Sequence, residues 1–537
     1  MQTIFKDKNR KPIYVLGLQS HNSSNGSSEM IDKSISAVKQ YHGNTLEVPV
    51  YWYQLEPEEG VFDLSMVEWL ISRVRASGLH LVILWFGFSK NCDLTYVPNW
   101  VKADPRRFRL AHHADGGVVP MMSPHCRETI EADKKAFVRL MEGIRAFDEK
   151  ERTVIAVQVE NEFGLYPTDR DYSKLGQADF DLGVPAALDG VELEDSGASH
   201  RDNSWNGRFG RYANEAFSSY YFGRAIEEIA SAGKEIYPDM PLYVNTSIGE
   251  NRQEVGGQSY PSGAAVGRVL EIFQKAAPTI CCFAADIYLA HKSAYLRTCA
   301  AHARLGNPLF IPETGTGGVA FGLNIIHAAA DYNAIGICGF GAESTLKGDG
   351  SLTDAAKEVA DSMQIIQLMS PMLLRHGGTD KIFCVTQEEF QGFSYVKREK
   401  YHITFNYTTK NAKGRALGYN MRIGSLLNDD PDIFNKRGRA IVYEASPTEY
   451  YIAGVGFTAN FLLRSDPDDL YPTRTYQSRA ASELTAFTIE EGHFTEDGEW
   501  VCEFVRRGDE VDCGAFLYPG IVLRVHLNPA SVMPVDD

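Results

Sequence analysis

The chain has 537 residues, of which 44% are hydrophobic and 11% aromatic, so it can bury large cores and is not a disordered protein. Its formal charge of −17, from 53 Lys and Arg against 70 Asp and Glu, disfavours nucleic acids and anionic membrane surfaces as partners, because these need clustered cations. A single core rarely supports this length, so we expect two domains.

The sequence shows neither a membrane segment nor a secretory signal. No run approaches the ~20 consecutive apolar residues that span a bilayer, and the polar residues 1–10 lack an apolar signal core. The nine cysteines have no repeated short spacing, and Cys281 and Cys282 are neighbours inside an apolar run, which favours reduced thiols. These features predict a cytoplasmic protein.

Short apolar runs alternate with longer amphipathic stretches up to about residue 350, a pattern typical of parallel strands joined by helices. The expected strands are 14–18, 45–50, 79–86, 153–159, 242–245, 280–288, 309–312 and 334–340. The expected helices are 29–41, 64–77, 127–147, 213–232, 266–276, 291–304 and 354–374. A polar segment, 168–210, is expected as an insertion after the fourth strand. This order predicts an α/β fold, a (β/α)8 TIM barrel over residues 1–375.

From Lys381 onward the pattern changes to short alternating segments separated by turn-rich patches. Examples are 401–405, 450–452 and 521–525, in which apolar residues occupy every second position. Such alternation is typical of antiparallel sheets with one covered face. We therefore expect a C-terminal antiparallel β-sandwich-like domain over residues 376–537.

Two glutamates stand at the ends of expected strands. Glu162 follows the fourth strand and Glu313 follows the seventh, and the carboxyl ends of barrel strands form the active-site face. Two such carboxyls suit glycoside hydrolysis, in which one protonates the leaving oxygen and the other attacks or activates water. A single glutamate after a strand is more often a solvated loop residue or a helix cap, so the pair carries the inference.

The string Gln158-Val159-Glu160-Asn161-Glu162-Phe163-Gly164 resembles the signature of glycoside hydrolase family 35, the clan A β-galactosidases. Other segments that resemble this family are 56–63, 85–87 with 90–91, 286–288 and, for the β domain of a bacterial branch, 455–461. The resemblance implies that Glu162 is the general acid/base and Glu313 the nucleophile. The implied activity is a retaining exo-glycoside hydrolase that releases terminal β-galactose by double displacement.

The resemblance also implies residues that bind the sugar. Asn161 would bind the sugar 2-hydroxyl, Asn91 would grip the sugar, and the Tyr288 hydroxyl would hold the nucleophile in place. A buried core tyrosine is an equal explanation for Tyr288. Glu47 could contact the sugar or balance Lys90, with a polar residue of the barrel interior as the equal alternative.

Two other functions fit the same sequence. Another clan A exo-glycosidase, acting on β-mannosides or α-L-arabinosides, would share both glutamates, and a catalytically silent carbohydrate-binding barrel would share the fold. The expected partner is a small neutral carbohydrate, with no nucleic acid and no membrane, and a homo-oligomer is compatible with the sequence. No cofactor and no metal are expected, because ligand residues do not recur at a recognised spacing.

Overall fold

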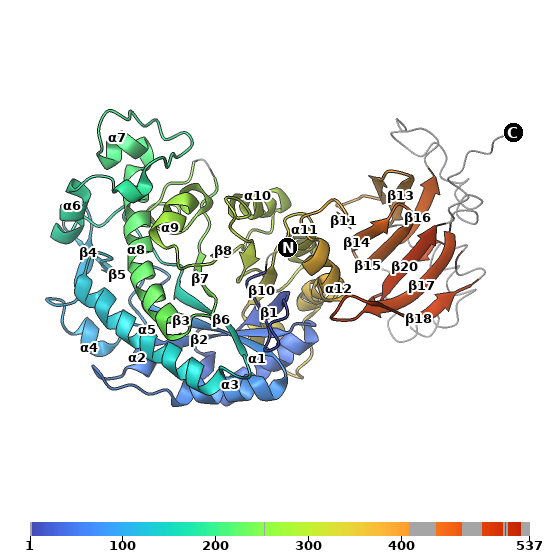
Figure 1. The fold of residues 1–537 in the computed structure, drawn as a ribbon, viewed down its shortest axis with the longest axis horizontal. Coiled ribbons are helices and arrows are strands. Elements are labelled where there is room, and N and C mark those ends of the chain that lie inside the picture. Colours follow the sequence, from blue (N-terminus) through green and yellow to red (C-terminus); the bar gives the residue numbers. More distant parts are fainter. Residues whose placement is uncertain are drawn as a thin grey trace. The chain divides into compact units, whose positions relative to one another are not determined.

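The computed structural model describes residues 3–251, 253–407, 436–463, 486–507, 511 and 514–527. These residues form two compact units (Figure 1). The barrel unit holds the chain up to Thr316 together with Ala334–Thr353, and the C-terminal unit holds Gly317–Asn333 and the described chain from Asp354 on. The domain boundary expected after residue 375 stays a prediction.

Eight parallel strands form the sheet of the barrel unit, in the order β8-β7-β6-β3-β2-β1-β10-β9. A parallel bridge between Ile287 and Thr314, just beyond β8 and β9, joins the two ends of this order. The strands are β1 (Val15–Gln19), β2 (Thr45–Tyr51), β3 (His80–Lys90), β6 (Val154–Asn161), β7 (Leu242–Thr246), β8 (Phe283–Ala285), β9 (Phe310–Ile311) and β10 (Gly336–Phe340). Each coincides with an expected strand, so the predicted barrel is confirmed.

Helices connect these strands, and their ends follow local sequence signals. The Ser27 side chain accepts a hydrogen bond from the Met30 amide and caps the first helix, and Gly78, with φ 78°, ends the next long one. The α-helices are α1 (Ser28–Gln40), α2 (Trp52–Leu55), α3 (Ser65–Ser77), α4 (Asn99–Lys102), α5 (Arg127–Asp148), α6 (Lys174–Asp181), α7 (Trp205–Phe209), α8 (Ala213–Ile236), α9 (Leu270–Ala276) and α10 (Lys292–His302).

Smaller elements occupy the loops of the barrel unit. A hairpin of β4 (Leu110–His112) and β5 (Val118–Met122) follows β3, and the predicted insertion after β6 contains α6 and α7. The 3-10 helices are η1 (Ser24–Gly26), η2 (Ala186–Leu188), η3 (Gly210–Tyr212), η4 (Gly267–Val269) and η5 (Ala342–Thr345).

Two antiparallel sheets build the C-terminal unit, in the orders β11-β14-β15-β20-β17-β18 and β12-β13-β16-β19. Their strands are β11 (Ile382–Thr386), β12 (Phe393–Lys397), β13 (Tyr401–Asn406), β14 (Arg439–Ser446), β15 (Glu449–Val455), β16 (Thr458–Leu463), β17 (Ala486–Phe494), β18 (Trp500–Arg506), β19 (Ala515–Phe516) and β20 (Val522–Leu527). Ile403 of β13 and Ile452 of β15 belong to one hydrophobic core, so both sheets share it. The predicted antiparallel β domain is confirmed.

Two helices belong to the same unit as these sheets: α11 (Val319–Ala330), which the sequence analysis did not predict, and α12 (Asp354–His376). The two helices lie against each other; α11 also lies against β11 and β14, and α12 against β14 and β15. The fully buried Arg439 of β14 donates to the Glu358 carboxylate of α12 at 2.9 Å. Along the described chain, none of the helices has the length and apolarity to traverse a bilayer.

Candidate active site

The chain leaves β6 through a strained turn that carries Glu162. The strand is buried throughout and ends at Asn161, and both Glu160 (φ 62°) and Glu162 (φ 40°) adopt positive φ. Such backbone costs about 1–3 kcal/mol per residue and persists only where the surroundings fix it. The Glu162 amide is fixed by donating to the Asn245 Oδ1 atom at 3.0 Å. Backbone strain that neighbouring residues hold in place is typical of functional sites.

Glu313, two residues past the end of β9 at Ile311, accepts hydrogen bonds from four side chains. Its Oε1 atom accepts from Gln19 Nε2 at 3.1 Å, Asn245 Nδ2 at 3.3 Å and Asn161 Nδ2 at 3.4 Å. Its Oε2 atom accepts from the Tyr288 hydroxyl at 2.6 Å. Donors aimed at both oxygens stabilise a negative charge and fix the carboxylate in one position, which is what a nucleophile needs.

Glu162 has the opposite electrostatic environment. Burial, followed by the nearby charge of Glu313, raises its pKa to about 7, although Lys90 and a hydrogen bond from Asp286 act in the opposite direction. A carboxyl with this pKa still holds a proton near neutral pH and can release it. The two glutamates are therefore close enough to interact electrostatically, and their surroundings differ: side-chain donors hold Glu313, whereas burial raises the pKa of Glu162.

Asp286 is a third carboxyl at this site, on the segment that follows β8. It is 2% exposed, and burial together with the charges of Glu313 and Glu162 raises its pKa well above the ordinary value. Its Oδ2 atom accepts from Asn245 Nδ2 at 2.8 Å. A protonated Asp286 can donate to Glu162, so it is able to orient that side chain without adding charge.

Lys90 orients the amide of Asn161. Its Nζ atom donates to the Oδ1 atoms of Asn161 and Asn91, each at 2.7 Å. Because the ammonium takes the oxygen side of the Asn161 amide, the NH2 group is left to donate to Glu313. Asn91, which has φ 50° and is exposed, also donates its backbone amide to the Asn161 carbonyl at 3.1 Å.

A buried carboxyl pair lies behind the strained turn. The Ser89 amide donates to Glu160 at 2.8 Å, while Trp85 Nε1 and the Phe88 amide donate to the two oxygens of Asp133, each at 2.8 Å. Burial and the neighbouring Asp133 raise the pKa of Glu160 well above its ordinary value.

Gly87 makes room for this carboxyl pair. A Cβ atom at position 87 would lie 2.3 Å from Asp133 Oδ2, 2.4 Å from Glu160 Oε1 and 2.5 Å from Trp85 Nε1. These distances are far below van der Waals contact, which explains why a glycine follows the Trp85-Phe86 pair.

Glu47 occupies the barrel interior. It is fully buried, the Tyr243 hydroxyl approaches its Oε1 atom to 3.5 Å, and its Oε2 atom has no hydrogen-bond partner. Burial and the charge of Glu313 raise its pKa well above the ordinary value. This location favours the alternative of a polar interior residue, and a contact of Glu47 with sugar stays a prediction.

The structure thus gathers most of the residues that the sequence singled out. Asn161, Tyr288, Glu162 and Glu313 form one cluster, and Asn91 joins it through Lys90. Sequence reasoning assigned no role to three further members of the cluster: Gln19, Asn245 and Asp286. A signal was present, because Gln19 directly follows the first expected strand and Asn245 ends the fifth, at the carboxyl edge where barrel sites form.

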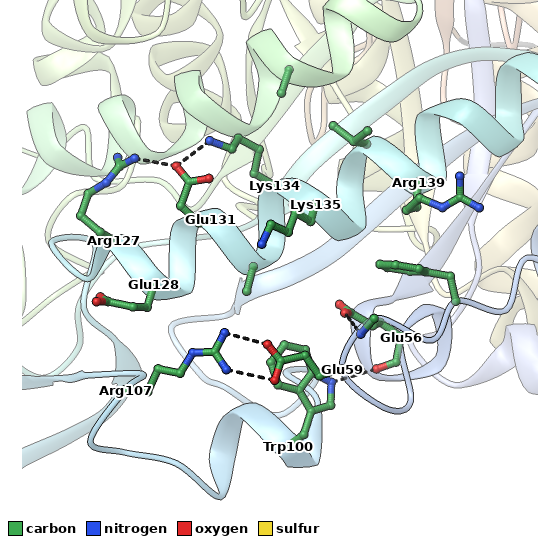
Figure 2. Close-up of a pocket in the computed structure, with 15 residues that line it drawn as sticks. Glu56, Glu59, Trp100, Arg107, Arg127, Glu128, Glu131, Lys134, Lys135 and Arg139 are labelled. Carbon is green, nitrogen blue, oxygen red and sulfur yellow. Dashed lines mark hydrogen bonds and ion pairs between the residues drawn. The ribbon is translucent and has the colours of Figure 1, made fainter.

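A second hollow, of about 750 Å³, lies along α5 (Figure 2). Several of its charged side chains form ion pairs with one another: Arg107 donates to both carboxylate oxygens of Glu59, and Arg127 pairs with Glu131. The Trp100 indole donates to the Glu56 carbonyl at 3.1 Å. This hollow holds neither of the strand-end glutamates, so the candidate active site is the cluster around Glu162 and Glu313.

The C-terminal part of the chain matches a known sequence family of undescribed function. The sequence profile of a domain of unknown function, DUF5597, matches residues 359–518, which lie in the C-terminal unit. No curated protein sequence matches the chain.

Two solved structures resemble the barrel. One is the catalytic domain of a β-amylase from Paenibacillus polymyxa, with 12% identity, a TM-score of 0.50, and coverage of 66% of this chain and 98% of that one. The other is a β-galactosidase from Bacillus circulans sp. alkalophilus, with 14% identity, a TM-score of 0.51, and coverage of 69% of this chain and 58% of that one. At these identities the likeness shows that the chain shares its barrel fold with glycoside hydrolases.

Proposed function

We propose that this protein is a retaining exo-glycoside hydrolase of family 35 type that releases terminal β-galactose. The observation that carries the proposal is the difference between the two strand-end carboxyls. Glu313 is held by four hydrogen-bond donors, whereas burial and the charge of Glu313 raise the pKa of Glu162 to about 7. An anchored carboxylate beside a protonated carboxyl is what double displacement requires.

In the first step, a Glu313 oxygen attacks the anomeric carbon of the sugar. The glycosidic bond breaks, and Glu162 gives its proton to the departing oxygen, so the sugar becomes an ester of Glu313. Esterification removes the negative charge of Glu313, which is one of the causes that raise the pKa of Glu162. Glu162 therefore becomes a stronger acid at the moment when it must remain deprotonated.

In the second step, the Glu162 carboxylate takes a proton from water, and the resulting hydroxide attacks the anomeric carbon. The ester bond to Glu313 breaks, the sugar leaves, and both carboxyls return to their starting protonation states. Asn161 and Tyr288 hold Glu313 in position during both steps. Asn161 would also contact the sugar 2-hydroxyl, which lies next to the reacting carbon.

A panel of chromogenic glycosides tests the substrate. We expect turnover of the β-galactoside, whereas turnover only of a β-mannoside or an α-L-arabinoside would keep the mechanism and change the sugar. Absence of hydrolysis together with saturable sugar binding would identify a silent carbohydrate-binding barrel. The panel therefore separates all three functions that fit the sequence.

Two variants test the assigned roles. Glu313→Ala should abolish turnover of every substrate, because no covalent intermediate can form. Glu162→Ala should still release a very good leaving group in the first step, since such a group needs no proton. Wild-type rates for both variants on a disaccharide would refute the assignment.

The stereochemistry of the product tests double displacement. NMR should show the β-anomer of galactose first, before mutarotation, and a 2-fluoro-galactoside should label Glu313. If the α-anomer appears first, the enzyme inverts and Glu313 is not a nucleophile.

A further inference from the structure

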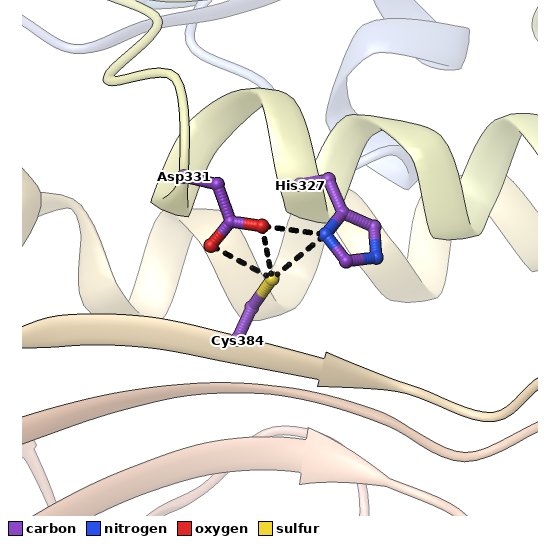
Figure 3. Close-up of side chains that lie close together, drawn as sticks. All are labelled: His327, Asp331 and Cys384. Carbon is purple, nitrogen blue, oxygen red and sulfur yellow. Dashed lines mark hydrogen bonds and ion pairs between the residues drawn. The ribbon is translucent and has the colours of Figure 1, made fainter. Parts of the chain in front are cut away.

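Three side chains of the types that bind metals converge within the C-terminal unit (Figure 3). His327 and Asp331 lie one helical turn apart at the end of α11, and Cys384 lies on β11. The His327 Nδ1 atom is 2.7 Å from Asp331 Oδ2 and 3.2 Å from Cys384 Sγ. The sulfur is 3.5 Å from each oxygen of Asp331. An imidazole nitrogen, a carboxylate oxygen and a thiol sulfur therefore all lie within 4.8 Å of one another.

We propose that His327, Asp331 and Cys384 bind one zinc ion. Zinc is bound by thiolate, imidazole and carboxylate at about 2.0–2.3 Å, so the ligand atoms of one tetrahedral ion lie about 3.4–3.6 Å apart. The separations between sulfur and nitrogen and between sulfur and oxygen, 3.2 and 3.5 Å, already approach this range. Calcium and magnesium prefer oxygen ligands, so a thiolate and an imidazole favour zinc.

The Asp331 side chain can move to make room for an ion. The 2.7 Å contact between His327 Nδ1 and Asp331 must widen by about 0.7 Å to admit an ion between them. The Asp331 side chain is 41% exposed, so it can rotate without disturbing a core. The same exposure leaves room for water at the fourth coordination position.

Thr386 holds the imidazole in the orientation that a metal ligand requires. The His327 Nε2 atom lies 2.8 Å from the Thr386 hydroxyl, and both residues are buried. When Nε2 carries the proton and donates it to Thr386, Nδ1 presents a lone pair toward Cys384 and Asp331. Metal-binding histidines are oriented in this way by a partner of their second nitrogen. An ion here would tie α11 to β11, whose ligands are 53 and 57 residues apart in sequence.

The test uses the full-length protein after removal of metals with a chelator. Titration with zinc should show one bound equivalent per chain and a raised melting temperature, because the ion binds only the folded unit. Titration with cobalt, which occupies zinc sites, should produce the near-ultraviolet absorption of a cobalt–thiolate bond.

Matched variants locate the ion. Cys384→Ser should abolish the cobalt–thiolate absorption, whereas Cys502→Ser, which changes an exposed cysteine of β18, should leave it unchanged. Asp331→Asn should weaken zinc binding without unfolding the protein, since its side chain is half exposed. Thr386→Val should weaken zinc binding about 10- to 100-fold, as expected for a partner that orients a ligand.

Two results would overturn the proposal. One is the absence of stoichiometric zinc binding, which would leave a hydrogen-bonded cluster without an ion. The other is a cobalt–thiolate band that survives Cys384→Ser, which would place the ion elsewhere. If Cys384→Ser fails to fold, Asp331→Asn provides the test instead. An unchanged zinc affinity in Asp331→Asn would also contradict the proposal. None of these measurements depends on glycosidase activity.

Discussion

Glu162 and Glu313 are identical in chemistry and differ only in their neighbours. Two amide groups of the strand ends, Asn161 and Asn245, donate to Glu313, whereas Lys90 is the cation that moderates the pKa of Glu162. Each neighbour comes from a different strand, so the surroundings of the two glutamates depend on the closed sheet. Their roles can therefore be tested by changing one residue and observing the other.

The charge of Glu313 should control the proton affinity of Glu162. In Glu313→Gln the negative charge is absent, and we expect the pKa of Glu162 to fall below 7, because only burial still raises it. NMR titration of the glutamate carboxyl carbons would measure this shift. A pKa that stays at about 7 in the variant would show that the two carboxyls do not interact.

The pH dependence of the wild-type enzyme follows from the same pKa. A raised pKa keeps Glu162 protonated up to about pH 7, so kcat/KM should be maintained below that pH and fall as the pH rises through it. Lys90→Met removes a cation that lowers this pKa, so the fall should move to higher pH. A fall that moves to lower pH would contradict the assignment of Glu162 as the acid.

Gly87 should be intolerant of a side chain. In Gly87→Ala the new Cβ atom would lie 2.3 Å from Asp133, so the carboxyl pair must shift, at a cost of about 1–3 kcal/mol in the free energy of unfolding. Because the pair supports the strained turn that carries Glu162, kcat should fall as well. Gly348→Ala, at a site open to solvent, is the control. Equal stability and activity of the two variants would contradict this account.

At the scale of elements, α11 and α12 are built into the C-terminal unit. Arg439 of β14 is fully buried and donates to both the carboxylate and the backbone carbonyl of Glu358 in α12, each at 2.9 Å. The profile match of the C-terminal domain also begins inside α12, at Val359. Two independent observations thus assign α12 to the same unit as the β strands.

The buried Arg439 should be a stability determinant of this unit. Arg439→Leu removes the partner of Glu358, and breaking a buried ion pair costs about 3–5 kcal/mol, reduced here because the Glu358 side chain is 27% exposed. Chemical denaturation would measure the loss. Arg437→Leu, which removes one hydrogen bond of 3.4 Å at a partly exposed site, should cost less than about 1 kcal/mol. Similar losses in both variants would argue against a special role for Arg439.

For the molecule as a whole, the C-terminal unit includes Gly317–Asn333 and the described chain from Asp354 on. Truncation after Arg375 would retain α11 and nearly all of α12 but remove strands that they lie against, β11 and β14 for α11 and β14 and β15 for α12; both helices bury apolar side chains. We expect insoluble or poorly active protein, because those apolar faces would be exposed to water. Recovery of a soluble truncated chain with unchanged kinetics would show that the β strands are dispensable.

Much of the fold could be predicted because parallel strands are buried on both faces and appear as continuous apolar runs. The eight runs correspond to the eight strands, and Glu162 and Glu313 are polar residues that follow two of them within three residues. Helix α11 was not found, because its sequence, from Val319 to Ala330, is apolar almost throughout and lacks a helical alternation of polar residues.

The order of the barrel strands and the strand-end positions of Glu162 and Glu313 follow from local residue patterns alone. Which residues meet depends on how the closed sheet brings distant segments together. Gln19 and Asn161 reach Glu313 from 294 and 152 residues away, and Cys384 reaches His327 across 57. The raised pKa of Glu162 has the same origin, because burial and the charge of a distant residue exist only once the barrel has formed.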